Sequence, residues 1–443
     1  MSIANQESNV NMKEFARRRK QLMRMMGEGS VAILPAAAMT IRNRDVDYPY
    51  RQDSDFQYLS GFPETEAVIV LIPGRKHAEY ILFCRERDME METWNGKRAG
   101  QAGACELYGA DDSFPINDID DILPGMMEGC ERVYYTMGAH PEFDQQVLQW
   151  VNTIRSMNRT GSRAPGEFVS LEHLLHDMRL YKSRAEIALH RKAMNVSVEA
   201  HKQAMSVAKP GMMEYQVEAE ILYHFQRNGM QTAYSSIVGS GENACILHYT
   251  ENDSALEKGD LLLIDAGAEM QCYAADITRT FPVSGVFNKA QKALYQVVLD
   301  AQLAAIDKVR PGNHWNEAHI AAVEVLTEGL VGLGILKGKV KKLIKDQAYR
   351  RFYMHRTGHW LGMDVHDVGD YKVDGEWREL EPGMMLTVEP GLYIPKGSKG
   401  VAKKWWNTGI RIEDDVLVTK DEPKVMTAAA PKTIDEIQDW MAR

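Results

Sequence analysis

Short apolar runs with β-branched residues mark the first third of the chain. "SVAILPA" begins at Ser30, and "EAVIVLIP" and "EYILFC" follow before about Tyr135, with Pro, Gly and a few helical stretches between them. Runs of this length, rich in Val and Ile and bounded by turn residues, are typical of buried strands. Strands alternating with helical segments predict an α/β domain with its own sheet.

Apolar positions recur at helical spacing later in the chain. Ser183 and Glu186 form a capping box before a long helix, and Pro210 follows where that helix is predicted to end. One face of this helix carries the apolar residues Ile187, Met194, Val198 and Met205. A second long helix is predicted from about Lys289 to Val309, and a Pro-Gly pair and a further amphipathic segment follow each of the two helices.

A twelve-residue phrase occurs twice in the sequence. "LEKGDLLLIDAG" ends at Gly267 and "LEPGMMLTVEPG" ends at Gly391, and each places an acid, Asp265 or Glu389, two residues before its last glycine. The apolar run before each acid predicts a short buried strand. Together with the two helix pairs, the repetition predicts a duplicated domain whose halves face each other around a shared site.

Length and polarity predict how the chain is organised. Its 443 residues exceed what one core usually organises, so two domains are expected. The polar stretch from Asn158 to Phe168 reads as a linker or a surface loop, and the boundary is expected between it and Ser183. We therefore predict an amino-terminal α/β domain at residues 1–176 and a catalytic domain at residues 177–443.

Composition excludes several classes of partner. A net charge of -10 and a pI near 5.8 argue against a nucleic-acid or membrane partner, because either needs a clustered basic face. The five cysteines are scattered without metal-ligand spacing, which fits a reducing compartment. The sequence shows no apolar core of a signal peptide and no membrane span, so a cytoplasmic protein is predicted.

Carboxylates gather after the first copy of the phrase. The sequence continues as "IDAGAEMQCYAADITRTF", and if the chain reverses near Met270 and Gln271, Asp265 and Asp276 face each other across a hairpin. Two bare carboxylates in this arrangement repel each other and raise one pKa. A cation between them is therefore predicted.

Further polar groups surround the second copy. "HRTGHWLGMDVHDVG" carries His355, His359 and His366 among glycines, which predicts a loop rather than a helix. In "TGIRIEDD", alternation places Arg411 and Glu413 on one face of a strand and the neighbouring isoleucines on the other.

Together the two regions supply four carboxylates and one imidazole. Four negative charges balance two divalent cations, as in two-metal hydrolytic sites. Oxygen-dominated ligation favours Mn²⁺, with Co²⁺ or Zn²⁺ able to substitute.

At these residues the sequence resembles the pita-bread metallopeptidases, the family of aminopeptidase P, prolidase and methionine aminopeptidase. "DYPYRQDSDFQYLSGFPE" from Asp47 resembles the amino-terminal domain of the proline-specific members, so the resemblance covers nearly the whole chain. "HYTEN" at His248 and "HWLGMDVHDVG" at His359 are most similar to bacterial aminopeptidase P. The resemblance implies an α/β (α+β) fold, with a smaller α/β domain before a pita-bread catalytic domain of pseudo-twofold duplicated halves.

The resemblance also implies a ligand set. Asp265 is expected to bind one metal through both oxygens, His359 and Glu389 the other metal, and Asp276 and Glu413 both. The residues implied to face the substrate are His248, His355 and His366. Arg411 is expected to orient the carboxylate of Asp265 or of Glu413.

The implied activity is removal of the first residue from peptides whose second residue is proline. The bond before proline is a tertiary amide without an N–H, so it needs a dedicated pocket. We hypothesise that a hydroxide bridging the two metals attacks the carbonyl while Glu389 takes the proton of the water. His366 or His248 then stabilises the oxyanion or helps to protonate the prolyl nitrogen.

Two residues and the assembly state carry further expectations. Cys272 stands where many relatives are expected to have glycine, within the proposed turn. The resemblance implies a homo-oligomer, a tetramer or a dimer, in which the amino-terminal domain narrows access and Trp94 reaches a neighbour's cleft.

Three other functions remain open at this stage. Prolidase has the same fold and metals but acts on Xaa-Pro dipeptides, and differs in pocket depth and in a cation that holds the free carboxylate. A non-catalytic binding module and a creatine-type hydrolase are disfavoured, because both lack the metal ligands that this sequence retains.

Overall fold

A computed structural model describes residues 12–443, and the chain divides into two compact units, Met1–Met178 and Arg179–Arg443. Helix α7 (Glu172–Leu180) carries the chain from the first unit into the second. Among residues 12–443, no helix is both long and apolar enough to cross a membrane.

The first unit is built on a mixed sheet. Within residues 12–178 this sheet has six strands in the order β6-β5-β4-β1-β7-β8. Its strands are β1 (Ser30–Pro35), β4 (Val68–Leu71), β5 (Tyr80–Cys84), β6 (Asp112–Pro115), β7 (Arg132–Tyr134) and β8 (Glu167–Val169). A separate hairpin joins β2 (Ile41–Asn43) and β3 (Val46–Asp47). The three apolar runs of the sequence form β1, β4 and β5, as predicted.

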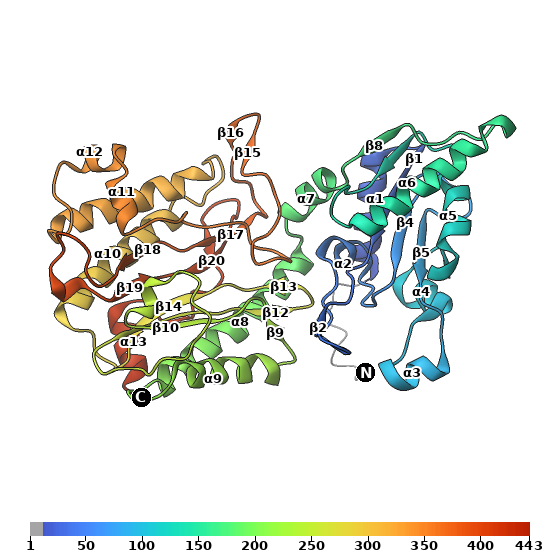
Figure 1. The fold of residues 1–443 in the computed structure, drawn as a ribbon. Helices are drawn as coiled ribbons and strands as arrows, with labels where there is room; N and C mark the ends of the chain where they lie inside the picture. The colour runs from blue at the N-terminus through green and yellow to red at the C-terminus, as the bar shows by residue number, and fades with distance from the viewer. Residues whose placement is uncertain (1–11) are drawn as a thin grey trace. The chain divides into compact units, whose positions relative to one another are not determined.

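The helices of the first unit are α1 (Met12–Met26), α2 (Ser54–Ser60), α3 (Met89–Asn95), α4 (Gly100–Tyr108), α5 (Ile119–Met127) and α6 (Pro141–Ser156). In Figure 1 α5 and α6 lie beside the sheet, whereas α3, which has no buried residue, lies away from the strands. Apolar side chains of α5 and α6, among them Leu123 and Trp150, join Ile33 and Val70 of the sheet in one buried cluster. The polar stretch after α6 leads into β8, so it is a surface loop of the first unit and not a linker.

The second unit contains two pairs of long helices. They are α8 (Arg184–Val207) with α9 (Glu214–Arg227), and α10 (Lys289–Ile306) with α11 (Asn316–Gly332); α12 (Val340–Lys345) and α13 (Ile434–Met441) are shorter. The Ser183 capping box at the start of α8 is present as predicted. In Figure 1 the strands of this unit lie between the α8–α9 pair and the α10–α11 pair.

The strands of the second unit are short and pair antiparallel. In the first half they are β9 (Gln231–Thr232), β10 (Ile237–Ser240), β11 (Leu261–Asp265), β12 (Ala268–Met270), β13 (Tyr273–Ala274) and β14 (Thr278–Pro282). In the second half they are β15 (Lys372–Val373), β16 (Glu376–Trp377), β17 (Met385–Val388), β18 (Gly391–Ile394), β19 (Thr408–Arg411), β20 (Asp414–Leu417) and β21 (Lys424–Val425). The repeated phrases form β11 and β17, which pair with β14 and β20. The predicted duplication is therefore confirmed.

The hairpin after the first phrase has a different register from the predicted one. Met270 pairs with Tyr273, so Gln271 and Cys272 form the two-residue turn, with φ of 53° and 65°. Positive φ at both central positions matches the twist of a tight hairpin. Asp265 consequently lies opposite Thr278 and not opposite Asp276, and the predicted reversal one residue earlier is wrong.

The strand predicted through Arg411 and Glu413 is also interrupted. β19 ends at Arg411 and β20 begins at Asp414, because the backbone N–H of Ile412 bonds to Pro390, between β17 and β18, and that of Glu413 bonds to β14. The backbone N–H of Glu413 donates to the carbonyl of Thr278 at 3.1 Å. Glu413 is thereby fixed between the two halves.

Candidate metal centre

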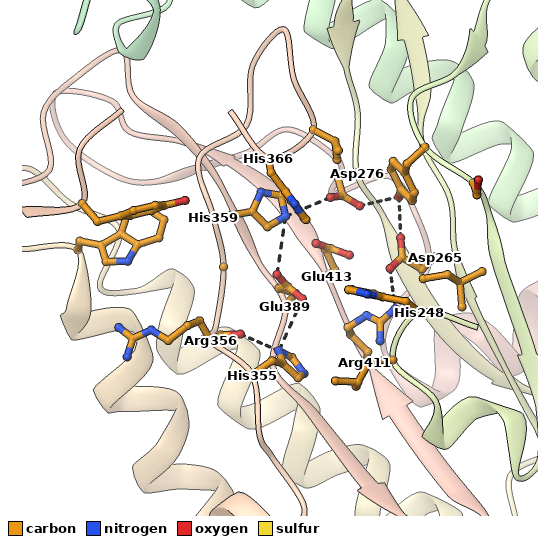
Figure 2. A pocket seen from close by; sticks show the side chains of 18 of the residues that line it. His248, Asp265, Asp276, His355, Arg356, His359, His366, Glu389, Arg411 and Glu413 are labelled. Atoms are coloured by element: carbon orange, nitrogen blue, oxygen red, sulfur yellow. Dashed lines mark hydrogen bonds and ion pairs between the residues drawn. The ribbon is translucent and has the colours of Figure 1, made fainter. Parts of the chain in front are cut away.

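The two repeated strands deliver their acids to one pocket of about 960 Å³ (Figure 2). Asp265 is the last residue of β11, and Glu389 follows β17 directly. The residues singled out from the sequence all line this pocket: His248, Asp265, Asp276, His355, His359, His366, Glu389, Arg411 and Glu413.

The glycine two residues after each acid explains why the phrase is repeated. A Cβ on Gly267 lies 1.7 Å from the carbonyl oxygen of Ala275. On Gly391 a Cβ lies 2.6 Å from the Tyr393 hydroxyl and 2.8 Å from the carbonyl oxygen of Ile410. In both halves another backbone passes too close for a side chain, immediately beside the acid.

Asp276, His359 and Glu413 each offer a ligand atom, and these atoms lie within 4.8 Å of one another. The Nε2 atom of His359 lies 3.3 Å from Asp276 Oδ2 and 3.8 Å from Glu389 Oε1. Its Nδ1 atom lies 2.9 Å from the carbonyl oxygen of Trp360, which can only accept. Nδ1 therefore carries hydrogen, and Nε2 is the atom directed at the carboxylates, as in metal-binding histidines.

Asp265 is held by a cation and a phenol. Arg411 Nη2 donates to Asp265 Oδ2 at 2.6 Å, and the Tyr234 hydroxyl lies 2.6 Å from Asp265 Oδ1 and 2.6 Å from Asp276 Oδ1. Burial alone raises the pKa of Asp265, but the charge of Arg411 and the two hydrogen bonds outweigh it and hold the pKa below its usual value. One hydroxyl proton cannot serve two anionic carboxylates, so Asp276 needs another positive partner.

The remaining acids are protonated more readily than usual. Burial, reinforced by neighbouring acids, raises the pKa of Asp276 and, more strongly, that of Glu413. Burial also raises the pKa of Glu389 to about 7 against the opposing charges of His359 and Arg411. Burial opposes charge on His359, but its bond to Asp276 raises the pKa of His359 to about 9. Protons thus balance the charge of the metal-free cluster, and divalent cations replace such protons when they bind.

Arg411 interacts with both carboxylates that the sequence predicted as alternatives, Asp265 and Glu413. It donates directly to Asp265, and its Nε atom donates to the Thr278 hydroxyl at 3.1 Å. That hydroxyl donates to Glu413 Oε2 at 2.6 Å. Arg411 therefore orients Asp265 directly and Glu413 through Thr278.

His355 is a neutral imidazole with a defined tautomer. Its Nδ1 donates to the carbonyl of Arg356 at 2.7 Å, so Nε2 accepts from the Tyr393 hydroxyl at 2.9 Å. Tyr393 in turn accepts from Arg411 Nη1 at 3.0 Å. Burial and the charge of Arg411 lower the pKa of His355 to about 3.

The other two histidines line the pocket differently. The His366 ring lies edge-to-face on His359, with ring centroids 4.3 Å apart. Burial and the charge of His359 lower the pKa of His366. His248 is exposed on a loop of the first half, on the Asp265 side of the pocket in Figure 2.

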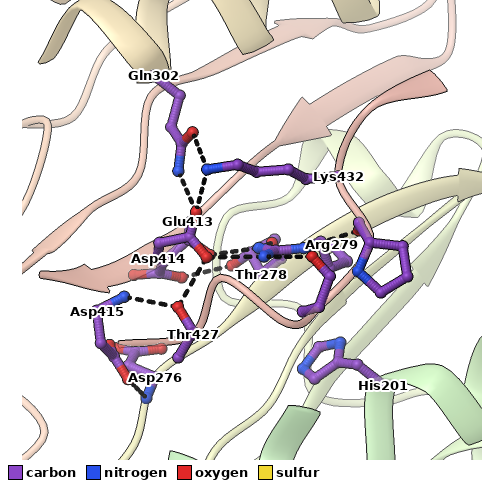
Figure 3. A network of polar contacts seen from close by, with 12 residues as sticks. His201, Asp276, Thr278, Arg279, Gln302, Glu413, Asp414, Asp415, Thr427 and Lys432 are labelled. Carbon is purple, nitrogen blue, oxygen red and sulfur yellow. Dashed lines mark hydrogen bonds and ion pairs between the residues drawn. The ribbon is translucent and has the colours of Figure 1, made fainter. Parts of the chain in front are cut away.

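A second polar network lies behind the ligands (Figure 3). Arg279 is fully buried and donates to Asp414 Oδ1 at 2.7 Å and to the carbonyl of Glu413 at 2.5 Å. Asp414 also accepts from Lys432 Nζ at 2.7 Å and from the Thr427 hydroxyl at 2.7 Å. This network fixes the backbone of Glu413 and the start of β20, which follows it directly.

Several residues of the site were not found from the sequence. Thr278 begins β14 two positions after Asp276, and Tyr393 lies in β18 four positions after Glu389, so their nearness to these acids in the sequence is the one signal that could have found them. Tyr234 lies far from the other site residues in the sequence, and no local pattern marks it. The aromatic pocket walls, Trp315 and Trp377, were also missed.

The comparisons with known proteins agree with this geometry. The model of "Metallopeptidase family M24" matches residues 188–420, and that of "Aminopeptidase P, N-terminal domain" matches residues 15–134. The chain belongs to metallopeptidase family M24. The predicted resemblance to bacterial aminopeptidase P and the predicted fold class are confirmed, and the chain is a metal-dependent hydrolase.

Two curated relatives of this family match along their whole length. Xaa-Pro aminopeptidase of Escherichia coli (strain K12) is 44% identical over 436 residues, which cover 98% of each chain. Xaa-Pro aminopeptidase of Haemophilus influenzae is 42% identical and covers 97% of each chain.

Solved structures of the family superpose closely. Aminopeptidase PepP of Pseudomonas aeruginosa has a TM-score of 0.97 at 60% identity, covering 98% of this chain and 99% of its own. Zn-substituted Escherichia coli aminopeptidase P in complex with product has a TM-score of 0.95 at 44% identity, covering 98% and 99%. Divalent metal binding is a property of this family, and the carboxylate and imidazole donors of this chain fit it.

Proposed function

We propose that this chain is a Xaa-Pro aminopeptidase, which releases the first residue from peptides with proline in the second position. One observation carries the proposal: the residues that match the aminopeptidase P pattern, although scattered from His248 to Glu413, line a single pocket. Relatives named Xaa-Pro aminopeptidase that match 97–98% of the chain support the same activity.

The ligand assignment follows from the donors at the base of the pocket. We assign Asp265 to one metal, His359 and Glu389 to the other, and Asp276 and Glu413 to both. Mn²⁺ is the favoured cation, because oxygen donors outnumber the single imidazole. Two such cations polarise the scissile carbonyl and lower the pKa of a water molecule when they are bound.

Glu389 is the residue that we assign to proton transfer. Its carboxylate lies between the imidazoles of His355 and His359, at 3.8 Å from each. A carboxylate in this position can take a proton from a nearby water molecule at the start of the reaction and release it later.

His366 and His248 are assigned to the substrate. A neutral His366 keeps one N–H that can donate to an oxygen on which negative charge develops. Replacing His366 with Ala is expected to lower turnover about 10²-fold with metal content unchanged. The matched control is His173→Ala, because His173 is exposed and bonds only to the carbonyl of Ser170. Loss of metal from the His366 variant would instead place it among the ligands.

Prolidase activity is the second candidate. Arg356 and Lys372 line the same pocket and could hold the free carboxylate of a dipeptide. Hydrolysis of an Arg-Pro-Pro tripeptide and of a Gly-Pro dipeptide, with chelated protein and after addition of Mn²⁺, distinguishes the two. We expect metal-dependent release of the first residue from the tripeptide and little turnover of the dipeptide. Preference for the dipeptide would establish prolidase, and inactivity on both with Mn²⁺, Co²⁺ or Zn²⁺ would refute a catalytic function.

The amino-terminal domain, residues 1–176, is assigned to assembly and the rest of the chain, residues 177–443, to catalysis. Trp94 supports an assembly role, because it is 79% exposed on a helix with no buried residue. We propose a homotetramer in the cytoplasm in which Trp94 reaches a neighbouring copy. Light scattering tests the assembly, and unchanged kinetics of Trp94→Ala on tripeptides and longer peptides would remove Trp94 from this role.

A further inference from the structure

His248 belongs to a loop that must be held by other residues. It lies between the 3₁₀ turn Asn243–Cys245 and strand β11, and it lines the pocket next to Arg411 in Figure 2. Among residues 12–443, the His248 side chain has no hydrogen-bonding partner. Its place in the pocket therefore depends on how the backbone of this loop is fixed.

Glu214 binds this loop at three points. It is the first residue of helix α9 and is fully buried. Its Oε1 atom accepts from the backbone N–H of Ser240 at 2.7 Å and from Asn243 Nδ2 at 3.1 Å. Its Oε2 atom accepts from the Tyr249 hydroxyl at 2.7 Å and from the backbone N–H of Ser254 at 3.0 Å. One carboxylate thus joins the beginning, the middle and the end of the segment 240–254.

These contacts require an anionic carboxylate at position 214. The four groups that contact its two oxygens all act as donors. Of these groups, only the tyrosyl hydroxyl could also accept a hydrogen bond. The backbone N–H of Glu214 also donates to the carbonyl of Ser254 at 2.9 Å. A negative charge at the first position of a helix is favourable with respect to the helix dipole. The buried charge is therefore satisfied from every side.

Tyr249 links Glu214 to the pocket. It follows His248 directly, is 5% exposed, and packs in a cluster with Ile237, Leu263 and Tyr393. Burial and the bond to Glu214 raise the pKa of Tyr249 to about 12, so the phenol remains a donor. Tyr393 in the same cluster bonds to His355 and Arg411, which places the His248 loop against the catalytic pocket.

We propose that Glu214 is a positioning residue for His248, acting through Tyr249 and the backbone of residues 240–254. The proposal rests on the proposed function, because it gives His248 a role toward the substrate. Glu214 lies too far from the pocket lining to be counted among its residues, and it acts only by holding the loop.

A double-mutant cycle between Glu214→Gln and His248→Ala tests this inference. Gln keeps the size of the side chain but replaces one acceptor oxygen by an NH₂ group that faces the loop donors. We expect Glu214→Gln to lower kcat about 10- to 100-fold with little change in KM and unchanged Mn²⁺ content. In the His248→Ala background the same substitution is expected to lower kcat less than threefold. Glu218→Gln, one turn along the same helix, is the matched control and should leave kcat unchanged.

The outcomes separate the inference from the proposed function. If both single variants lower kcat and their effects multiply in the double variant, Glu214 does not act through His248 and the inference is wrong. If His248→Ala leaves kcat unchanged, the role of His248 fails and the inference fails with it. Should Glu214→Gln not fold, Tyr249→Phe takes its place in the cycle, with an expected three- to tenfold loss of kcat that His248→Ala again removes. Multiplicative effects of Tyr249→Phe would equally overturn the inference.

Discussion

The two acids that end the repeated strands are held in opposite ways. Asp265 accepts from Arg411 and from the Tyr234 hydroxyl at 2.6 Å each, and its pKa lies below the usual value. Among residues 12–443, the Glu389 carboxylate has only longer contacts, to the neutral His355 and to His359 at 3.8 Å each, and burial raises its pKa to about 7.

This difference shows how the two halves of a duplicated domain can give equivalent acids different chemical properties. The strands place both acids at corresponding positions, but Arg411 of the second half donates directly to Asp265 of the first, whereas Glu389 has His355 and His359 at 3.8 Å. In the absence of metal, Asp265 therefore loses its proton more readily than usual and Glu389 less readily. Duplication explains the position of each acid, and the neighbouring residues explain its chemistry.

The largest expected effect is the loss of turnover in Asp265→Asn and Glu389→Gln. Each removes a charged ligand, and Glu389→Gln also removes the proton acceptor, so kcat is expected to fall at least about 10³-fold in both. Steady-state kinetics on a tripeptide at saturating Mn²⁺ measure this. A variant that retains a tenth of the original kcat would remove that residue from the catalytic centre.

The same two variants should differ when the metal is removed. Asp265→Asn leaves the buried Arg411 without its anion, which costs about 3–5 kcal/mol of the free energy of unfolding. Glu389→Gln replaces a group that is readily protonated in the metal-free protein, so its cost is expected to be below about 1 kcal/mol. Urea unfolding of the chelated variants measures the two free energies. Equal destabilisation by Asp265→Asn and Glu389→Gln would contradict the contrast between the two acids.

The glycines of the repeated phrase provide a second comparison. Gly267→Ala is expected to destabilise the protein by about 3 kcal/mol or more, because the new Cβ meets a backbone carbonyl that cannot move away. Gly391→Ala should cost less, about 1–2 kcal/mol, because its new Cβ would stay 2.6 Å from the Tyr393 hydroxyl and 2.8 Å from the Ile410 carbonyl oxygen, a milder overlap than the 1.7 Å at Gly267. Gly332→Ala is the control, because nothing lies within 4 Å of its Cβ. A larger loss of thermal stability in Gly391→Ala than in Gly267→Ala would contradict this prediction.

Tyr234→Phe examines the hydroxyl between Asp265 and Asp276. Without it the two carboxylates lose their common hydrogen-bond partner, and Mn²⁺ affinity is expected to fall about 10- to 100-fold. Titration calorimetry of the chelated protein measures the affinity. Tyr223→Phe, an exposed tyrosine on α9, serves as the control. If Tyr234→Phe left the Mn²⁺ affinity unchanged, Arg411 alone would be enough to orient the Asp265 carboxylate.

The last expected effect concerns the pH dependence of stability. The metal-free fold keeps a proton on His359 up to about pH 9, whereas an ordinary histidine loses it near 6.5. Between these values the folded state binds more protons than the unfolded state, so the free energy of unfolding falls as pH rises, by up to about 1.4 kcal/mol per pH unit. Urea unfolding of the chelated protein at pH 7, 8 and 9 tests this, with His359→Gln expected to weaken the trend. Stability that increases with pH would contradict the ion pair with Asp276.

The acids and histidines that line the pocket could be singled out from the sequence because their signals are local. An acid at the end of an apolar run, a histidine among glycines and an alternating Arg-Ile-Glu each mark a position without knowledge of the rest of the fold. The capping box of α8 is similarly local, and it was found in place.

What the sequence could not reveal depends on contacts between distant segments. Glu214 at the start of α9 and Tyr234 after β9 carry no local signal, and only the fold brings Ser254 to the first and Asp265 to the second. The hairpin register was missed because Gln271 and Cys272 carry no strong preference for positive φ, unlike the Asn-Gly pairs that usually mark such turns.

The network behind Glu413 has a consequence for biosynthesis. Arg279 donates to the carbonyl of Pro431, and Asp414 accepts from the ammonium group of Lys432. Pro431 follows Arg279 by 152 residues. Domains of a growing chain generally fold in order of synthesis, starting from the amino terminus. The polar network behind Glu413 can therefore close only after residues 431 and 432 have been synthesised, long after the first unit has left the ribosome.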